Sequence, residues 1–257
     1  MQNAGAPGEG EVVLRASFFA AESPSAVPLG TAEATLAPGG FLQWSLAEVA
    51  PRAAGRQGYV RVERVRGSAP YYAYGVLNDN GTSDGSFVVP QSGGAAATAG
   101  GLSLPVVVEA GVFSTEVVVT NISESASSLE LTYVSKEIPS GAATALLTVP
   151  ARGQVLLPGF VDWLRRQPGS VVPSAGPGFV GPLLVTARTS SLEGITVSGR
   201  TSTPAEVGDG RYGLYYAAVP FGASNTTPVS LMGLRQDGEN RTNAAFVNTG
   251  ELSLIHI

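Results

Sequence analysis

The residues that could perform catalysis in this 257-residue chain are few. The chain has no Cys and one His, His256, which excludes a thiol nucleophile and a multi-His metal centre. A Ser-His-Asp triad would depend on His256 alone. A Ser-Lys pair would need Lys136 beside Ser135, at the end of an expected strand, where a solvated lysine is the simpler interpretation. The sequence therefore does not favour nucleophilic catalysis.

Paired carboxylates offer another route to catalysis, as in glycosidases. The candidate acids are Glu48, near Trp44, and Asp162, beside Trp163. Each acid belongs to a short expected helix in a different copy of the repeat described below. We expect the Trp of each helix to cover one end of a hydrophobic core while the acid faces water. We therefore predict no catalytic residue and no enzymatic activity.

Two kinds of loop could bind an ion or a cofactor. Residues 78–85 include Asp79 and Asp84, whose oxygens could bind calcium, although the spacing is not that of an EF-hand. Asp, Asn and Gly are also the residues that β-turns require, so both interpretations stay open. Residues 176–181 and 208–213 match G-x-G-x-x-G, but both lead into expected strands rather than helices. We predict no metal-binding residue, no cofactor-binding residue and no cofactor.

An aromatic strand and the overall charge bear on partners. Tyr72 and Tyr74 share one face of an expected strand at residues 71–77, because side chains alternate along a strand. That face could stack on a sugar ring, or it could pack within the protein. The net charge is −5, so the chain lacks the basic surface that nucleic acids require. No apolar run approaches the roughly 18 residues of a spanning helix, so we expect no membrane insertion.

The candidate catalytic and binding residues must be positioned by short segments rich in Val, Leu, Tyr, Phe and Thr. These segments are bounded by Gly, Pro, Ser or Asn and recur about every ten residues, which is typical of an antiparallel sandwich or barrel. The sequence therefore predicts an all-β fold. Expected strands span residues 12–19, 58–65, 71–77, 86–89, 106–108, 116–120, 129–134, 145–149, 183–188, 194–200 and 214–219. Short helices are expected at residues 41–50 and 161–166.

The sequence also repeats itself. Five residues recur 127 positions later in the same order, namely Ser103, Leu104, Gly111, Thr115 and Asn121 as Ser230, Leu231, Gly238, Thr242 and Asn248. Residues 1–90 match the later part of the same unit, with Gly58 in the place of Gly181. We interpret residues 1–100 as a partial repeat without its opening strands, 101–228 as a complete repeat, and 229–257 as the truncated start of a third. The expected linkers are residues 91–101 and 221–228.

This interpretation makes the chain a fragment. Met1 then lies within a repeat, and we interpret residues 252–257 as translated adapter sequence from DNA library preparation. His256 would not belong to the natural protein. Residues 229–250 match the strands that the first repeat lacks, so they could complete it by strand addition, within the chain or between chains.

The order of these features resembles the tandem Ig-like β-sandwich repeats of large secreted or surface-attached bacterial proteins. The features are a strand ending in V-x-N, a strand such as VVLRASFFA, the Pro-Gly turn of LAPGGFLQW, a short helix, then G-x-V-x-V and a strand ending in V-P. The resemblance covers nearly all of residues 1–250. It implies antiparallel Ig-like β-sandwich repeats with one short helix per repeat.

The resemblance also implies a function and a location. It implies a non-enzymatic structural or adhesive module, placed outside the cell or on its surface by a signal peptide outside this fragment. The implied partners are neighbouring repeats of the same chain, with a surface glycan or protein as a further ligand. The alternative is a carbohydrate-binding accessory module of a secreted hydrolase.

Overall fold

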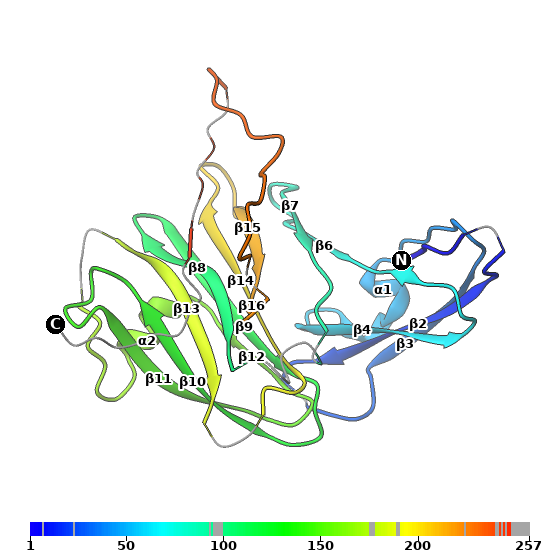
Figure 1. Ribbon diagram of the computed structural model, residues 1–257, viewed down its shortest axis with the longest axis horizontal. Coiled ribbons are helices and arrows are strands. Elements are labelled where there is room, and N and C mark those ends of the chain that lie inside the picture. Colours follow the sequence, from blue (N-terminus) through cyan, green and yellow to red (C-terminus); the bar gives the residue numbers. More distant parts are fainter. Residues whose placement is uncertain are drawn as a thin grey trace.

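The computed structural model describes residues 1–247 except residues 7, 23, 93, 95–99, 175–177, 189–190, 224, 240–241, 243 and 245. It contains two groups of antiparallel strands, which Figure 1 shows side by side. We call residues 1–88 the N-terminal group and residues 102–220 the large group. The described residues form mostly antiparallel sheet and very little helix, which confirms the all-β prediction.

The large group is one nine-stranded sheet. Seven strands run in the order β11-β10-β13-β8-β9-β14-β15, while β12 pairs with β9 and β16 pairs with β8. Their bounds are β8 (Leu102–Ala110), β9 (Phe113–Asn121), β10 (Ser127–Val134), β11 (Ala142–Val149), β12 (Gln154–Leu157), β13 (Phe179–Ala187), β14 (Ile195–Pro204), β15 (Arg211–Ala217) and β16 (Val219–Pro220). Strands β8 and β9 pair only beside their turn, at Glu109–Ser114 and Ala110–Phe113.

The core of the large group lies between β10, β11 and β13 on one side and β9, β12 and β14 on the other. It contains 23 of the described buried hydrophobic residues. Strand β10 shows why these residues form strands: Leu129, Leu131 and Tyr133 point inward at every second position and are fully buried. The Tyr133 hydroxyl donates to the carbonyl oxygen of Val107 at 3.2 Å, which satisfies a polar group inside the core.

The N-terminal group is smaller and has three short sheets, β3-β2-β4, β1-β5 and β6-β7. The strands are β1 (Gln2–Asn3), β2 (Val12–Ala20), β3 (Gly30–Leu36), β4 (Gly58–Arg66), β5 (Tyr71–Tyr72), β6 (Gly75–Asn78) and β7 (Gly85–Val88). Among the described residues, eight of its buried hydrophobic side chains form two clusters of four. This group therefore has much less core than the large group.

The helices are shorter than expected or displaced. Helix α1 covers only Leu46–Val49, followed by a 3₁₀ turn η1 (Pro51–Ala53), whereas a helix was predicted over residues 41–50. The first residues are extended because the Leu42 N–H donates to the carbonyl of Met1 at 3.0 Å. Trp44 thus precedes the helix and is half-buried. Helix α2 (Phe160–Arg165) lies one residue before the predicted span, and Trp163 packs on the core as expected.

Two buried asparagines occupy similar places in the two groups. Asn3 ends β1 and Asn121 ends β9, and both side chains are fully buried. The Asn3 Nδ2 donates to the carbonyl of Leu36 at 2.9 Å, and the Asn121 Nδ2 donates to the carbonyl of Val149 at 3.3 Å. Each asparagine therefore ties the end of one strand to the end of another, β3 or β11.

Two glycines likewise permit a close backbone approach in each group. A Cβ on Gly58 would lie 2.0 Å from the carbonyl oxygen of Phe19, and a Cβ on Gly181 would lie 1.8 Å from that of Val134. No side chain fits at such distances, so only glycine allows β4 to pack on β2, and β13 on β10, at these points.

Candidate functional site

A polar contact joins the two groups of strands. Arg200 on β14 is largely buried, and its Nη2 lies 3.3 Å from the Asp84 Oδ2, just before β7. The Gly213 N–H donates to the same Asp84 oxygen at 2.8 Å. The Arg200 Nε donates to the Ser86 hydroxyl at 3.2 Å, and that hydroxyl donates to the Gly213 carbonyl at 3.3 Å. We call these four residues the inter-group clamp, because they join the two groups of strands. Its charged pair is largely sheltered from solvent, which strengthens the interaction.

The loop considered for calcium contributes to this contact. The Asp79 Oδ1 accepts hydrogen bonds from the Gly81 N–H at 2.9 Å, the Thr82 N–H at 3.0 Å and the Thr82 hydroxyl at 3.2 Å. Partial desolvation raises the pKa of Asp79, but these hydrogen bonds outweigh it and the pKa is lowered. The Thr82 hydroxyl also donates to the Arg211 carbonyl at 3.0 Å. Both Asp79 and Asp84 therefore bind N–H or guanidinium groups of the chain itself.

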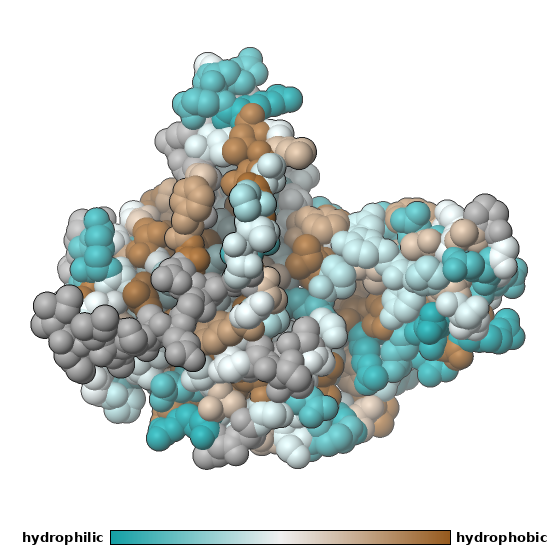
Figure 2. All heavy atoms as spheres, viewed as in Figure 1, coloured by the Kyte–Doolittle hydropathy of each residue, from teal (hydrophilic) through white to brown (hydrophobic). Residues whose placement is uncertain are grey.

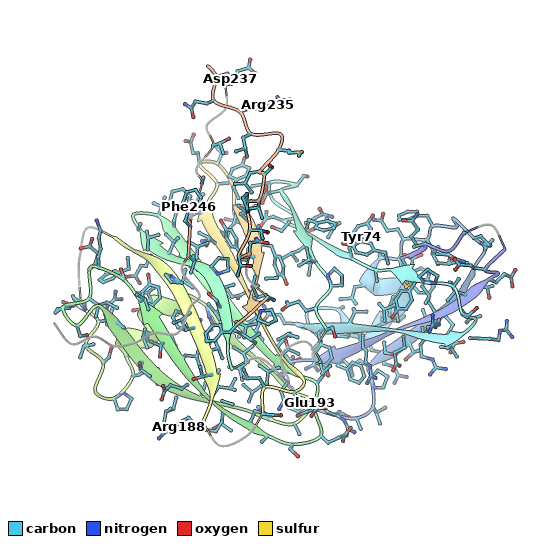
Figure 3. The ribbon with its side chains drawn as sticks, viewed as in Figure 1. Tyr74, Arg188, Glu193, Arg235, Asp237 and Phe246 are labelled. Carbon is cyan, nitrogen blue, oxygen red and sulfur yellow. The ribbon has the colours of Figure 1, made fainter. Side chains whose placement is uncertain are left out.

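Three aromatic rings form a cluster on the N-terminal group. The Tyr72 and Tyr74 ring centroids are 6.2 Å apart, and those of Tyr74 and Phe87 are 5.1 Å apart. Their exposed fractions are 43% for Tyr72, 37% for Tyr74 and 50% for Phe87. Tyr74 follows β5 and precedes β6 in the chain, and Figure 3 shows it on the side of the N-terminal group away from β2 and β4. The rings therefore pack on one another outside the core and leave aromatic surface open to a ligand.

The candidate acids Glu48 and Asp162 are not brought together. Glu48 caps helix α1, because its Oε2 accepts from the Ser45 N–H and hydroxyl, both at 2.7 Å. The hydroxyl contact and then the backbone contact lower the Glu48 pKa. Asp162 forms ion pairs with Arg165 at 3.3 Å and Arg166 at 2.9 Å on helix α2. Each acid has a local structural partner in a different group of strands.

Several notable groups were not singled out from the sequence. Arg200 sits on the polar face of an expected strand, and nothing local marks its partner Asp84, 116 positions away. Arg165 on α2 pairs with Glu109 on β8, which raises the Arg165 pKa. Glu116 on β9 is half-buried, and desolvation raises its pKa although Arg200 acts in the opposite direction. Only the long-range fold brings these groups together.

The remaining sequence signals take simple positions. Residues 208–213 lead into β15, as expected for turn glycines, whereas residues 176–177 of the other string lie outside the described residues. Residues 252–257 also lie outside them, as do residues 95–99 of the first expected linker. Within the described ranges, no three His, Cys, Asp or Glu side chains are grouped to hold a metal ion. No helix there is long and apolar enough to cross a membrane.

Comparisons with known proteins complete this description. No protein-family model matches the chain, and neither the curated proteins nor the solved structures include a match. Inferences about function must therefore come from the geometry of the clamp, the aromatic cluster and the two groups of strands.

Proposed function

We propose that this chain is a structural or adhesive module of an extracellular bacterial protein, built from tandem Ig-like β-sandwich repeats. The inter-group clamp is the observation that carries this proposal. A largely buried Arg–Asp pair with further hydrogen bonds from Ser86 and Gly213 would hold consecutive repeats in one orientation. Such a module would act by fixing the spacing and orientation of its neighbours and by presenting its loops.

The repeat is supported by strand pairings and hydrogen bonds that both groups of strands share. Strand β2 lies between β3 and β4, as β10 lies between β11 and β13. The backbone N–H of Asn3 donates to Gly40, and that of Asn121 donates to Gly153, at 2.9 and 2.8 Å. Strands β1 and β5 pair next to Asn3, as β9 and β14 pair next to Asn121. One shared ancestral unit would account for all of these matches.

Small-angle X-ray scattering on the full chain tests whether the clamp fixes the two groups. Asp84→Ala removes the acceptor of both Arg200 and the Gly213 N–H, so we expect a larger radius of gyration and a broader distribution of interatomic distances. Asp209→Ala is the matched control, because Asp209 is exposed in the turn next to β15. If Asp84→Ala and Arg200→Ala both scatter like the parent chain, the clamp does not set the orientation.

A second candidate function is carbohydrate binding, which the exposed aromatic cluster favours. Aromatic faces pack against the apolar faces of sugar rings, and Tyr hydroxyls can bind sugar hydroxyls at the same time. Tyr72, Tyr74 and Phe87 provide three adjacent rings of which a third to a half is exposed. This is the surface that a carbohydrate-binding accessory module would need.

A glycan array tests this second function. Tyr74 contacts both other rings, so Tyr74→Ala should abolish any specific glycan signal. Tyr212→Ala is the control, because Tyr212 is also an exposed tyrosine but lies on β15. Binding that survives Tyr74→Ala, or an array without signal above background, would reject glycan binding at this cluster.

A further inference from the structure

Strand β4 has one edge that no strand covers among the described residues. It pairs with β2 along Gly58–Arg66, and this is its only strand partner there. The matching strand β13 pairs with β10 on one edge and with β8 on the other. Exposed backbone N–H and C=O groups on such an edge are a template for another strand. The edge of β4 is therefore the place where a counterpart of β8 would bind.

The hydrophobic side of β4 is uncovered at Val60, whereas Val62 packs on the core beside Tyr71, whose hydroxyl donates to the Val62 carbonyl at 3.1 Å. Leu183 on β13 is fully buried, whereas Val60, its counterpart on β4, is 46% exposed. Gly58 and Gly181 fix this correspondence, because each makes the same close approach to the neighbouring strand. A β8-like strand would bury Val60 as β8 buries Leu183.

Residues 229–237 repeat the apolar pattern of β8. The buried apolar positions of β8 are Leu102, Leu104 and Val107, with an irregular spacing that accompanies a register shift. The residues 127 positions later are all apolar and exposed, namely Val229, Leu231 and Leu234. Leu104 is fully buried, whereas Leu231 is 61% exposed. The segment has the side chains of a core strand without a core to bury them.

In this structure residues 229–237 form no strand and extend away from both groups of strands. Figure 2 shows hydrophobic side chains along this extension below a hydrophilic tip, and Figure 3 places Arg235 and Asp237 at that tip. The extension starts beyond β16 on the large group and points to the top of the view, whereas β4 lies low in the N-terminal group (Figure 1). The geometry thus leaves this segment available to another molecule.

We propose that residues 229–237 of one copy of this chain bind as an antiparallel strand to the free edge of β4 in a second copy. The β8–β13 pairing predicts the register, with Leu231 opposite Val60 and Val229 opposite Val62. Leu234 would lie opposite Gly58, as Val107 lies opposite Gly181. Main-chain hydrogen bonds then supply affinity, and the apolar side chains supply specificity.

The occupant is a second copy because both halves of the interface are present in every chain. The donor segment and the acceptor edge lie on different surfaces, so the contact between copies is heterologous and joins them head to tail. The proposal rests on the same correspondence between groups as the proposed function. It does not depend on the clamp or on the aromatic cluster.

Cysteine cross-linking tests the register, because the chain has no Cys of its own. The Val60→Cys chain is mixed with the Leu231→Cys chain under mild oxidation, and we expect a disulfide-linked pair of two different copies. The control mixture uses Met232→Cys, one residue further, whose side chain would face away from Val60 in the register. Equal yields from both mixtures would overturn the proposal. So would a doubly substituted Val60→Cys, Leu231→Cys chain that links only to itself.

Sedimentation velocity provides a second measurement on the full chain. We expect association that grows with concentration, and Leu231→Asp should weaken it by at least about tenfold because the charge would enter a core. Met232→Asp is the matched control and should leave association unchanged. Both residues are exposed in the single chain, so neither change should affect its folding. A chain that stays monomeric, or association that Leu231→Asp does not weaken, would overturn the proposal.

The two tests separate this proposal from the proposed function. If scattering shows the clamp-dependent orientation but no association occurs, strand exchange is wrong and the structural module stands. If copies cross-link at Leu231 while Asp84→Ala leaves the scattering unchanged, strand exchange stands and the clamp does not set the orientation.

Discussion

The substitution Asn121→Ala tests whether a single buried amide holds the end of β9. The Asn121 side chain makes four hydrogen bonds. Its Nδ2 donates to the carbonyls of Ser125 and Val149, at 2.8 and 3.3 Å. Its Oδ1 accepts from the Ser123 N–H and hydroxyl, at 2.9 and 2.7 Å. Alanine would remove all four without disturbing the apolar core.

The cost follows from where each partner lies. Val149 is fully buried, so its carbonyl loses a partner that water cannot easily replace, at about 1–3 kcal/mol. Ser123 and Ser125 are accessible to water, so their lost contacts should cost only about 1 kcal/mol together. We therefore expect Asn121→Ala to lower the free energy of unfolding by about 2–4 kcal/mol.

Urea unfolding followed by tryptophan fluorescence can isolate this effect. A Trp44→Phe background leaves Trp163, which packs on Phe160 in the core of the large group, as the only reporter. Ile122→Ala is the control, because Ile122 is adjacent but exposed and should change stability by less than about 0.5 kcal/mol. If Asn121→Ala costs less than about 1 kcal/mol, the reasoning about this asparagine is wrong.

Three further predictions use the same unfolding assay. Leu131→Ala should cost about 2–5 kcal/mol by opening a cavity, whereas Leu146→Ala, on an exposed position of β11, should cost little. Gly181→Ala should cost at least about 1–3 kcal/mol because its Cβ would press on β10, while Gly238→Ala meets no atom within 4 Å and should be neutral. Glu116→Gln should stabilise the chain at pH 7, and the gain should vanish below about pH 4. Because the Glu116 pKa is raised in the folded state, the parent chain loses stability as the pH rises from the unfolded pKa through the folded pKa of this residue. The glutamine side chain does not titrate, so the variant does not lose this stability. The first prediction fails if the two leucine substitutions lower the free energy of unfolding equally, and the second fails if the two glycine substitutions do. The third fails if the gain in stability from Glu116→Gln does not depend on pH.

Most of the strands could be predicted because alternation and turn residues are local signals. Strand β10 was predicted at residues 129–134 and observed at Ser127–Val134. Three strands were missed, namely β3, β12 and the two-residue β1. Strand β3, with the sequence GTAEATL, alternates small and polar residues and buries only Leu36. Strand β12 has four residues, and its extended form depends on pairing with β9. Such strands are determined by their neighbours, which the local sequence does not show.

The candidate sites were harder to predict than the strands. Alternation placed Tyr72 and Tyr74 on one face of a single strand. That strand is divided into β5 and β6, with Tyr74 between them, and the two rings still lie together. Alternation gave no sign that Phe87 would join them, since β7 reaches that place through the turn after β6. The turn residues of the 78–85 loop were recognised, but Asp84 also binds Arg200 on a strand far along the chain. Long-range contacts of this kind depend on packing between strands and cannot be inferred from spacing.

The pairing of β16 with β8 has a mechanical consequence. Val219 pairs with Ser103, and Pro220 with Leu102, so the first and last strands of the large group meet at their outer ends. A pulling force applied through the chain would enter and leave this group at almost the same point. It would first act on these two residue pairs, before any load reached β9 or β10. The large group would then lie beside the line of force, and the chain would lengthen little until the pairing of β16 with β8 was broken.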